Sequence, residues 1–222
     1  MSTRDPLERL PEDLRPLAEG LSRHRIEVCL DLLDKRRSDV VFVAEATHRR
    51  HNVSAIMRSA EAFGVHEAHL VAPTFKASKG AAKGAERWMD IHMHTETGAC
   101  VAALRERGFR IYVADFEEGA LTPADLPVDA PLALLFGGEL AGVSEEARAL
   151  ADGAICIPMR GVTQSLNVSV AAGILLREAC EKARSSGRPA GITGTDRHRF
   201  LLAFLRRERE RSAAARALYT EA

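Results

Sequence analysis

The chain has 222 residues, of which 46% are hydrophobic and 28% are charged. This length fits one ordinary α/β domain with short appendages, and the composition excludes a wholly disordered or low-complexity chain. No stretch approaches the ~20 apolar residues that a membrane span needs, and the first residues are charged where a signal peptide would be apolar. We therefore expect a cytoplasmic protein.

Cysteine and histidine spacing predicts neither a disulfide framework nor a metal site. No CxxC pair occurs among the four cysteines, which are Cys29, Cys100, Cys156 and Cys180. We expect all four to be small, buried hydrophobic side chains. The eight histidines show no spacing typical of metal ligands either.

The 31 basic and 31 acidic residues cancel in sum, but they are unevenly distributed. Residues 111–157 hold nine acidic residues and one basic residue, whereas residues 182–216 hold ten basic and three acidic. A second basic cluster occupies residues 35–37 and 48–51. Such clusters can attract a polyanion even at zero net charge, with solvated surface arginines as the alternative for either cluster.

Apolar residues recur at helical spacing over residues 6–37, which predicts two short amphipathic helices separated near Gly20. We interpret residues 1–38 as a helical N-terminal extension. Residues 39–46 are a continuous apolar run with β-branched side chains, typical of a strand buried on both faces of a parallel sheet. Helical spacing returns over residues 53–63 and ends at Gly64.

Strand-like and helical stretches alternate along the next part of the chain. The strands are predicted at residues 68–72, 110–114, 132–136 and 154–157, and the helices at residues 97–106, 144–151 and 168–183. This alternation predicts an α/β fold with a mostly parallel sheet over residues 39–183. Residues 184–222 are expected to form a basic linker and a last helix over about residues 196–218.

A parallel sheet raises the question of nucleotide binding, which is usually marked by a glycine-rich turn directly after the first strand. Residues 46–52 contain no glycine, and this excludes a dinucleotide fingerprint or a P-loop there. Glycines instead follow the strand at residues 132–136, in the segment FGGELAG from Phe136 to Gly142. They either let backbone amides approach a ligand closely or form a plain strand-to-helix turn.

Polar side chains mark two helix starts. Ser165, Asn167 and Ser169 precede or open an apolar helix, where one of them is expected to act as a cap and all three also suit a binding loop. Asn52 stands at the start of the helix over residues 53–63, where an N-cap is its simplest role. Arg58 lies near the apolar side of that helix, so its guanidinium either reaches solvent or points into a polar cleft.

Three segments resemble, in order and spacing, the three motifs of the SPOUT-class (SpoU/TrmH) RNA ribose 2′-O-methyltransferases. They are residues 52–65 (NVSAIMRSAEAFGV), 135–144 (LFGGELAGVS) and 157–172 (IPMRGVTQSLNVSVAA). The resemblance extends to the helical lead-in and the basic C-terminal helix, and so covers nearly the whole chain. It implies a SPOUT fold, in which a Rossmann-like sheet ends in a C-terminal trefoil knot, and a homodimer that binds S-adenosylmethionine in the knot.

The resemblance also implies roles for individual residues. The catalytic residues it indicates are Arg58, Asn52 and Glu139. The cofactor-binding residues carry over as Ala114, Asp115, Gly137, Gly138, Ile157, Ser165, Leu166 and Asn167. We expect RNA to contact the basic residues Lys35, Arg36, Arg37, Arg49, Arg50, Arg197, Arg199, Arg206 and Arg207. An arginine is a poor general base at neutral pH, which favours electrostatic stabilisation by Arg58 over proton abstraction, and the reaction requires no metal.

The family members most similar in the flanking segments methylate the ribose 2′-hydroxyl of guanosine 18 in the tRNA D-loop, so tRNA is the expected partner. Arg49-Arg50 and Leu140-Ala141 depart from the usual motif residues, and these departures leave fine substrate preference open. A 2′-O-methyltransferase that acts on ribosomal RNA or on another tRNA position is one alternative, although the residues before the first strand are too few for the extra RNA-binding domain of many ribosomal RNA methyltransferases. A non-catalytic RNA-binding protein is a second alternative, but the presence of the motif side chains argues against it. A nicotinamide oxidoreductase, the third, lacks its glycine fingerprint.

Overall fold

The computed structural model describes residues 5–45, 50–139, 141–189 and 191–220. Internal contacts divide the chain into two compact units, Arg37–Pro189 and a second unit that joins Met1–Arg36 to Ala190–Ala222. The sheet lies entirely in the first unit, whereas helices supply the regular structure of the second.

Six strands form one parallel sheet in the order β3-β2-β1-β5-β4-β6. Their bounds are β1 Val40–Glu45, β2 Glu67–Val71, β3 Asp90–His94, β4 Arg110–Ala114, β5 Leu132–Phe136 and β6 Gly153–Ile155. Because all the pairings are parallel, the carboxyl ends of the strands share one edge of the sheet. Residues that follow different strands are therefore brought together there.

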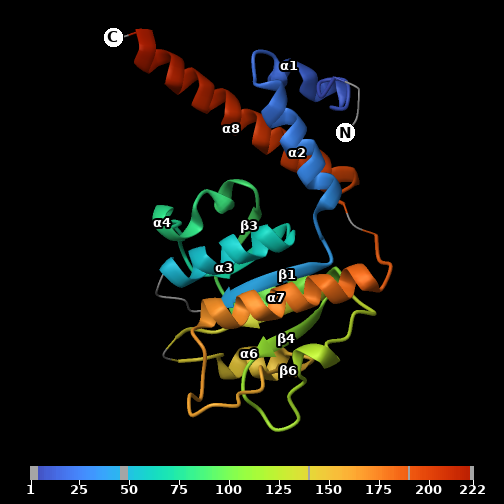
Figure 1. Ribbon diagram of the computed structural model, residues 1–222, viewed down its shortest axis with the longest axis vertical. Helices are drawn as coiled ribbons and strands as arrows, with labels where there is room; N and C mark the ends of the chain where they lie inside the picture. Colours follow the sequence, from blue (N-terminus) through green and yellow to red (C-terminus); the bar gives the residue numbers. More distant parts are fainter. Residues whose placement is uncertain (1–4, 46–49, 140, 190, 221–222) are drawn as a thin grey trace. The chain divides into compact units, whose positions relative to one another are not determined.

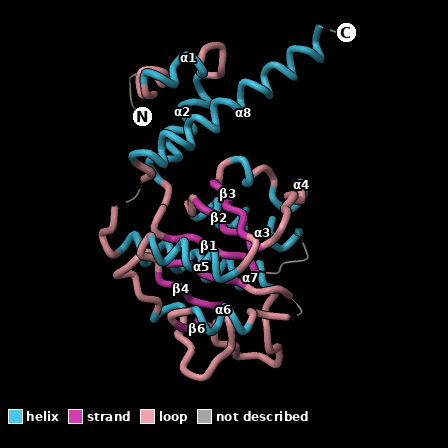
Figure 2. The backbone as a smooth tube through the Cα atoms, turned by 180° about the vertical axis from the view of Figure 1, so that it is seen from behind, coloured by secondary structure: helices cyan, strands magenta, loops and turns pink. Residues whose placement is uncertain are grey.

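Helices cover both faces of the sheet. The elements of this unit are α3 Arg50–Phe63, α4 Lys79–Ala82, η2 Ala85–Arg87, α5 Thr97–Glu106, η3 Pro123–Asp125, α6 Glu145–Leu150 and α7 Val168–Ser185. Helices α3 and α7 lie on one face (Figure 1), where their apolar side chains join one core cluster. Helices α5 and α6 lie on the other face (Figure 2), where their apolar side chains join a second cluster.

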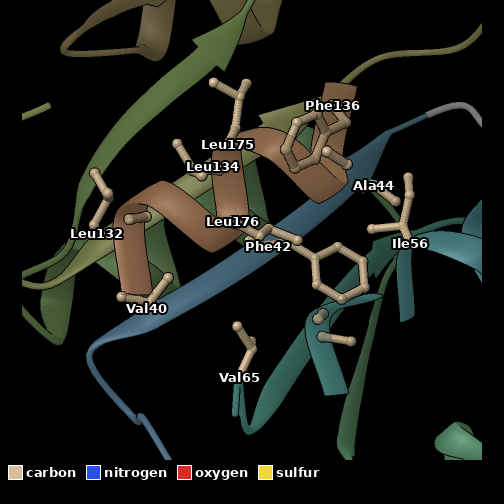
Figure 3. Packing of buried hydrophobic residues seen from close by; sticks show 14 of the residues in the cluster. Val40, Phe42, Ala44, Ile56, Val65, Leu132, Leu134, Phe136, Leu175 and Leu176 are labelled. Carbon is tan, nitrogen blue, oxygen red and sulfur yellow. The ribbon is translucent and has the colours of Figure 1, made fainter. Parts of the chain in front are cut away.

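Strand β1 lies at the centre and is buried on both sides. Val40, Phe42 and Ala44 point into the cluster beneath α3 and α7 (Figure 3), whereas Val41 and Val43 point into the opposite cluster. Each fully buried aliphatic or aromatic side chain contributes about 1.5–3 kcal/mol to folding. The continuous apolar run at residues 39–46 is explained by this position, since both faces of the strand lack solvent.

The predicted α/β fold with a parallel sheet is confirmed, and most element bounds agree within two residues. Strand β3 was missed because its sequence, DIHMH, contains only two apolar side chains and forms no continuous apolar run, although polar and apolar residues alternate in it. It is an edge strand that pairs with β2 through the backbone. Burial of all four cysteines is wrong at Cys156, which is only partly buried; the other three are buried free thiols.

The second unit contains η1 Glu12–Leu14, α1 Arg15–Ala18, α2 Arg23–Lys35 and α8 Gly194–Thr220. Its buried side chains include Ile26, Leu30, Leu33, Phe200, Leu201 and Phe204. Ion pairs link its N-terminal and C-terminal segments, with Arg25 Nε 2.7 Å from Glu208 Oε2 and Arg197 Nη1 2.9 Å from Asp34 Oδ1. The chain ends are therefore joined by apolar packing reinforced with charge pairs.

None of the helices in the described part of the chain has both the length and the apolar content needed to span a membrane.

Candidate functional site

A cavity of about 530 Å³ lies at the carboxyl ends of β4, β5 and β6. It is lined by the catalytic candidate Glu139 and by all eight residues predicted to bind the cofactor, namely Ala114, Asp115, Gly137, Gly138, Ile157, Ser165, Leu166 and Asn167. The crevice beyond the carboxyl ends of parallel strands is the usual ligand site of such sheets. Three segments that are distant in the sequence therefore build one site.

The lining combines an apolar floor with polar groups. Phe136, Ile155 and Leu175 belong to the buried core and also line the cavity. Asp115 and Asn167 supply polar side chains in the same wall. Such a mixture suits a ligand that carries both an apolar ring and hydrogen-bonding groups.

The loop after β5 is held in a tight turn by its own glycines. A Cβ atom on Gly137 would lie 2.1 Å from the carbonyl oxygen of Gly142, so no larger residue fits. Gly138 and Gly142 exchange two backbone hydrogen bonds of 2.9 and 2.8 Å, and Gly142 adopts a φ of 68°. The glycines thus shape a closed loop, and this loop forms one wall of the cavity.

Glu45, at the carboxyl end of β1, binds the residue at the C-terminal end of this loop, Ser144. Its carboxylate accepts hydrogen bonds from Ser144 N at 2.9 Å, from Ser144 Oγ at 2.6 Å and from Thr97 Oγ1. Ser144 in turn caps α6, since its Oγ accepts a hydrogen bond from Ala147 N at 3.0 Å. Only 4% of Glu45 is exposed, so these bonds compensate for burial of its carboxyl group.

Sequence reasoning missed Glu45. The available signal was a single acidic residue at the end of an otherwise apolar strand. A buried carboxylate is found only where hydrogen-bond donors meet it, and here the donors come from residues 52 and 99 positions further along the chain. Their position could not be obtained from the local pattern.

Asn167 joins the third motif to the first. Its Oδ1 caps α7 by accepting hydrogen bonds from Ser169 N at 2.9 Å and Ser169 Oγ at 2.6 Å. Its Nδ2 donates to Asn52 Oδ1 at 3.5 Å. The expected capping role thus falls to Asn167. Asn52 lies inside α3, which begins at Arg50, so the prediction of Asn52 as an N-cap is wrong.

Helices α3 and α7 pack side by side from their first turns onward. Besides the Asn52–Asn167 contact, a Cβ atom on Gly173 would lie 3.7 Å from Ser59 Oγ. Arg58, the residue before Ser59, is exposed on α3, and its side chain forms no ion pair or hydrogen bond with the described residues. Its guanidinium is thus available to an incoming ligand on the surface beside this helix pair.

An acidic and a basic side chain meet on one side of the cavity. Arg148 Nε donates to Asp115 Oδ2 at 2.6 Å, and it also lies 3.4 Å from Glu117 Oε1. Asp115 accepts a further hydrogen bond from Phe116 N at 2.8 Å. Phe116 is 62% exposed and lines the same cavity, so an aromatic ring stands at its edge.

The predicted RNA-binding residues differ widely in exposure. Lys35, Arg50, Arg199 and Arg206 are exposed, Arg197 and Arg207 are partly buried, and Arg49 lies outside the described residues. Arg36 and Arg37 are 0% and 1% exposed, so their assignment to an RNA-contacting surface is wrong. Arg37 instead donates to Asp39 Oδ1 at 2.8 Å and to the carbonyl oxygens of Ala183 and Arg188.

Residues 39–177 match the SpoU rRNA Methylase family, and this range contains every segment that lines the cavity. The chain belongs to the SpoU methylase family.

Individual SpoU-related proteins extend the likeness beyond that range. The tRNA (guanosine(18)-2′-O)-methyltransferase of Thermus thermophilus is 43% identical over 170 residues, which are 74% of this chain and 84% of the relative. The TrmH/SpoU tRNA modifying enzyme of A. aeolicus superposes with a TM-score of 0.76 at 29% identity, covering 83% of this chain and 96% of that one. The SpoU methyltransferase AviRb from Streptomyces viridochromogenes, solved in complex with AdoMet, has a TM-score of 0.60 at 27% identity and covers 70% and 65% of the two chains.

Proposed function

We propose that this chain transfers a methyl group from S-adenosylmethionine to the ribose 2′-hydroxyl of guanosine 18 in the tRNA D-loop. This proposal rests mainly on the cavity, which is lined by residues of the second and third motifs. The contact between Asn52 and Asn167 joins the first motif to the third. The substrate assignment is supported by the Thermus thermophilus relative, whose name specifies this nucleotide.

The cavity fits S-adenosylmethionine in size and character. Its volume of about 530 Å³ lies within the usual range for small-ligand sites. Phe136, Leu166 and Leu175 offer apolar surface for the adenine ring, and the backbone of the loops at Gly137 and Ile157 offers hydrogen-bonding groups. The AdoMet complex of AviRb supports the same choice. When bound, the cofactor supplies a methyl group on a sulfonium, which is already activated for displacement and so requires no metal in the reaction.

We assign Arg58 to stabilisation of the negative charge that develops on the ribose oxygen. A guanidinium presents a fixed, planar set of N–H donors to an oxyanion. Asn52 serves as a positioning residue, because its side chain contacts the N-cap of α7. Glu139, which lines the cavity beside Gly138, is assigned to orienting the ligands in the second motif.

Basic residues are proposed to hold the tRNA by its phosphates, while the shape of the loop selects the target. The exposed candidates are Lys35, Arg50, Arg199 and Arg206. Arg197 and Arg207 are partly buried and contribute less. Methylation of ribosomal RNA remains the second candidate function, since the matched family is described by that activity.

We further propose a homodimer with a trefoil knot, acting in the cytoplasm where tRNA is found. Helix α7 supports the dimer, because it exposes Val170 and Ile174 by 50% and 42% on a helix whose start lines the cavity. Burying such apolar side chains against a second copy would remove them from water. The knot rests on the structural likeness to the TrmH/SpoU enzyme of A. aeolicus. The domain division proposed is a helical extension over residues 1–38, a catalytic domain over 39–183 and a basic linker and helix over 184–222.

The test uses purified protein, labelled S-adenosylmethionine and an unmodified tRNA transcript. We expect a single 2′-O-methyl group at guanosine 18, found by mapping the product, and none on a matched transcript with adenosine at that position. Ribosomal RNA fragments run in parallel should stay unlabelled. Label on another nucleotide or only on ribosomal RNA would reject the substrate, and no label on any RNA would reject the activity.

A further inference from the structure

A cluster of imidazoles lies on the face of the sheet that α5 covers. Strands β2 and β3 pair in parallel with His69 opposite His92, and each strand adds a further polar residue on the same face, Glu67 and His94. The His69 ring stacks on that of His92 with the centroids 4.7 Å apart. The cluster belongs to neither the cavity nor its loops.

Two imidazole nitrogens in this cluster are buried without a hydrogen-bond partner among the described residues: His69 Nε2 and His92 Nε2. Carboxylate oxygens lie near both nitrogens. His69 Nε2 lies 3.4 Å from Glu67 Oε2, and His92 Nε2 lies 3.6 Å from Glu67 Oε2 and 3.4 Å from Asp90 Oδ2. A buried polar atom left unpaired costs free energy, so these two nitrogens call for a ligand.

We propose that Glu67, His69 and His92 bind a zinc ion that ties strand β3 to strand β2. The two imidazole nitrogens and the carboxylate oxygen all lie within 4.8 Å of one another. A tetrahedral zinc ion with bonds of about 2.0–2.2 Å places its ligand atoms roughly 3.3–3.6 Å apart. The observed separations of 3.4 and 3.6 Å agree with that spacing.

Outer hydrogen bonds orient two of the three ligands. His69 Nδ1 lies 3.0 Å from His94 Nε2, which fixes the ring and leaves Nε2 for the ion. Arg107 donates to Glu67 Oε2 at 2.7 Å and to Oε1 at 2.9 Å. Each carboxylate oxygen has two lone pairs, so Oε2 can accept from Arg107 and still bind a metal.

A second group of possible ligands shares His69 and adds His94 and Cys100. It is less suitable, because burial raises the pKa of Cys100 to about 12 and because His69 and His94 already pair with each other. Cys100 therefore provides a matched control: its substitution tests the second group and leaves the first intact.

The proposed site would explain why a polar edge strand is held in place. Strand β3 carries few apolar side chains, and an edge strand has backbone partners on one side only. A zinc ion bound only by the folded chain adds its binding free energy to the stability of the sheet. Strand β3 would then supply a zinc ligand, His92, as well as the edge of the sheet.

The experiment titrates zinc into the full chain after treatment with a chelator, using calorimetry and thermal unfolding. We expect one zinc ion per chain and a higher melting temperature. His92→Ala should weaken binding at least 100-fold, with the conservative His92→Asn as the second variant should the first fold poorly. Cys100→Ala and the exposed His24→Ala should bind zinc within threefold of the original chain.

Cobalt spectroscopy on the unsubstituted protein gives a readout that does not depend on variants. Ligation by nitrogen and oxygen gives weak visible bands without the intense thiolate charge-transfer band. Absence of zinc uptake, equal affinity in the His92 variants, loss of binding in Cys100→Ala or a thiolate band would each overturn the proposal.

Discussion

The side chains of Asn52 and Asn167 meet at 3.5 Å, although 115 residues separate them in the chain. The two polar atoms of the Asn167 amide make different contacts, since the oxygen caps α7 and the nitrogen donates to Asn52. The start of α7 is thereby attached to α3, the helix that carries Arg58. The first and third motifs are therefore in direct contact through this pair.

The two tasks of Asn167 can be separated by substitution. Asp is as good an N-cap as Asn but lacks the amide donor, whereas Ala lacks both groups. We expect Asn167→Ala to lower the free energy of unfolding by about 1 kcal/mol, and Asn167→Asp to leave it nearly unchanged. Both variants should reduce methyl transfer. Denaturant unfolding and turnover measured on the same samples check this, and equal stability of the two variants would contradict the capping role.

Replacement of Arg58 by alanine should lower turnover by about 100- to 1,000-fold, the usual effect of removing one donor to a developing oxyanion. Affinity for S-adenosylmethionine should stay within threefold, because Arg58 does not line the cavity. Lysine should rescue poorly, since it lacks the planar fork. Rapid-quench turnover and calorimetry separate the two effects.

Arg110 offers the matched control for Arg58. It is a surface arginine paired with Asp129 at the amino end of β4, away from the edge where the cavity opens. Arg110→Ala should leave turnover within twofold. Near-normal turnover of Arg58→Ala at saturating tRNA would show that Arg58 is not required for the reaction.

Glu45 should be required for the shape of the cofactor loop. Glu45→Gln keeps the volume but removes the charge and replaces one accepting oxygen by an amide donor, so a hydroxyl that faces this amide must accept where it donated before, and the bond from Ser144 N loses its charged acceptor. We expect the free energy of unfolding to fall by about 1.5–3 kcal/mol, the range for hydrogen bonds to charged groups. Cofactor affinity should fall as well, and calorimetry measures it.

Glu146 is the control for Glu45, because it accepts a single 3.2 Å bond from Gly98 N at the surface. Glu146→Gln should change stability by less than about 0.5 kcal/mol. If both variants behaved alike, the anchoring role of Glu45 would be lost.

Much of the site could be predicted because local signals and motif signals coincide. Strand β1 is apolar on both faces, and the FGGELAG segment follows a buried strand, so each lies where its sequence indicates. Family motifs then relate residues that no periodicity connects. The eight expected cofactor residues share one cavity for that reason.

The failures have a common physical cause. Arg36 and Arg37 look like surface charge in sequence, but burial depends on what packs against them, and Arg37 finds Asp39 and two carbonyl oxygens inside the protein. The histidines have no ligand spacing along the chain because β2 and β3 bring them together across strands. Pairing of strands is a non-local property that a single sequence does not state.

The pH dependence of stability follows from the imidazole cluster in metal-free protein. Burial lowers the pKa of both His69 and His94, so each binds its proton more readily in the unfolded chain, where the pKa is about 6.5. The groups that face them are Glu67, His92, Arg107, Asp90 and Cys100. The free energy of unfolding should therefore be constant at higher pH and should fall as the pH drops below about 6.5.

Denaturant unfolding between pH 8 and pH 5 measures this slope. His94→Gln removes one of the titrating groups and should flatten the slope, whereas the exposed His24→Gln should leave it unchanged. Glu67 does not contribute in this window, because its lowered pKa affects stability only below the ordinary range of a glutamate. A slope that is the same in all three proteins would assign the acid sensitivity elsewhere.

Removing the second unit should separate cofactor binding from tRNA binding. The segment 37–189 keeps the sheet, both core clusters and Arg188, which pairs with Asp39 and donates to the carbonyl oxygen of Ala130 at 2.6 Å. We expect it to fold, as judged by circular dichroism, and to bind S-adenosylmethionine with unchanged affinity. It lacks the exposed basic residues of the extension and tail, so it should bind tRNA more weakly.

Salt dependence distinguishes lost phosphate contacts from a lost dimer contact. Each phosphate contact removed lowers the slope of log affinity against log salt by about 0.7–0.9, so the segment 37–189 should show a flatter line than the full chain. The full chain with Lys35, Arg199 and Arg206 replaced by glutamine is the matched comparison, since these three residues are exposed. It should flatten the line while sedimentation shows an unchanged assembly. If the substituted chain keeps the slope of the full chain while the segment 37–189 binds tRNA weakly, the helices of the second unit support assembly. In that case other residues make the phosphate contacts.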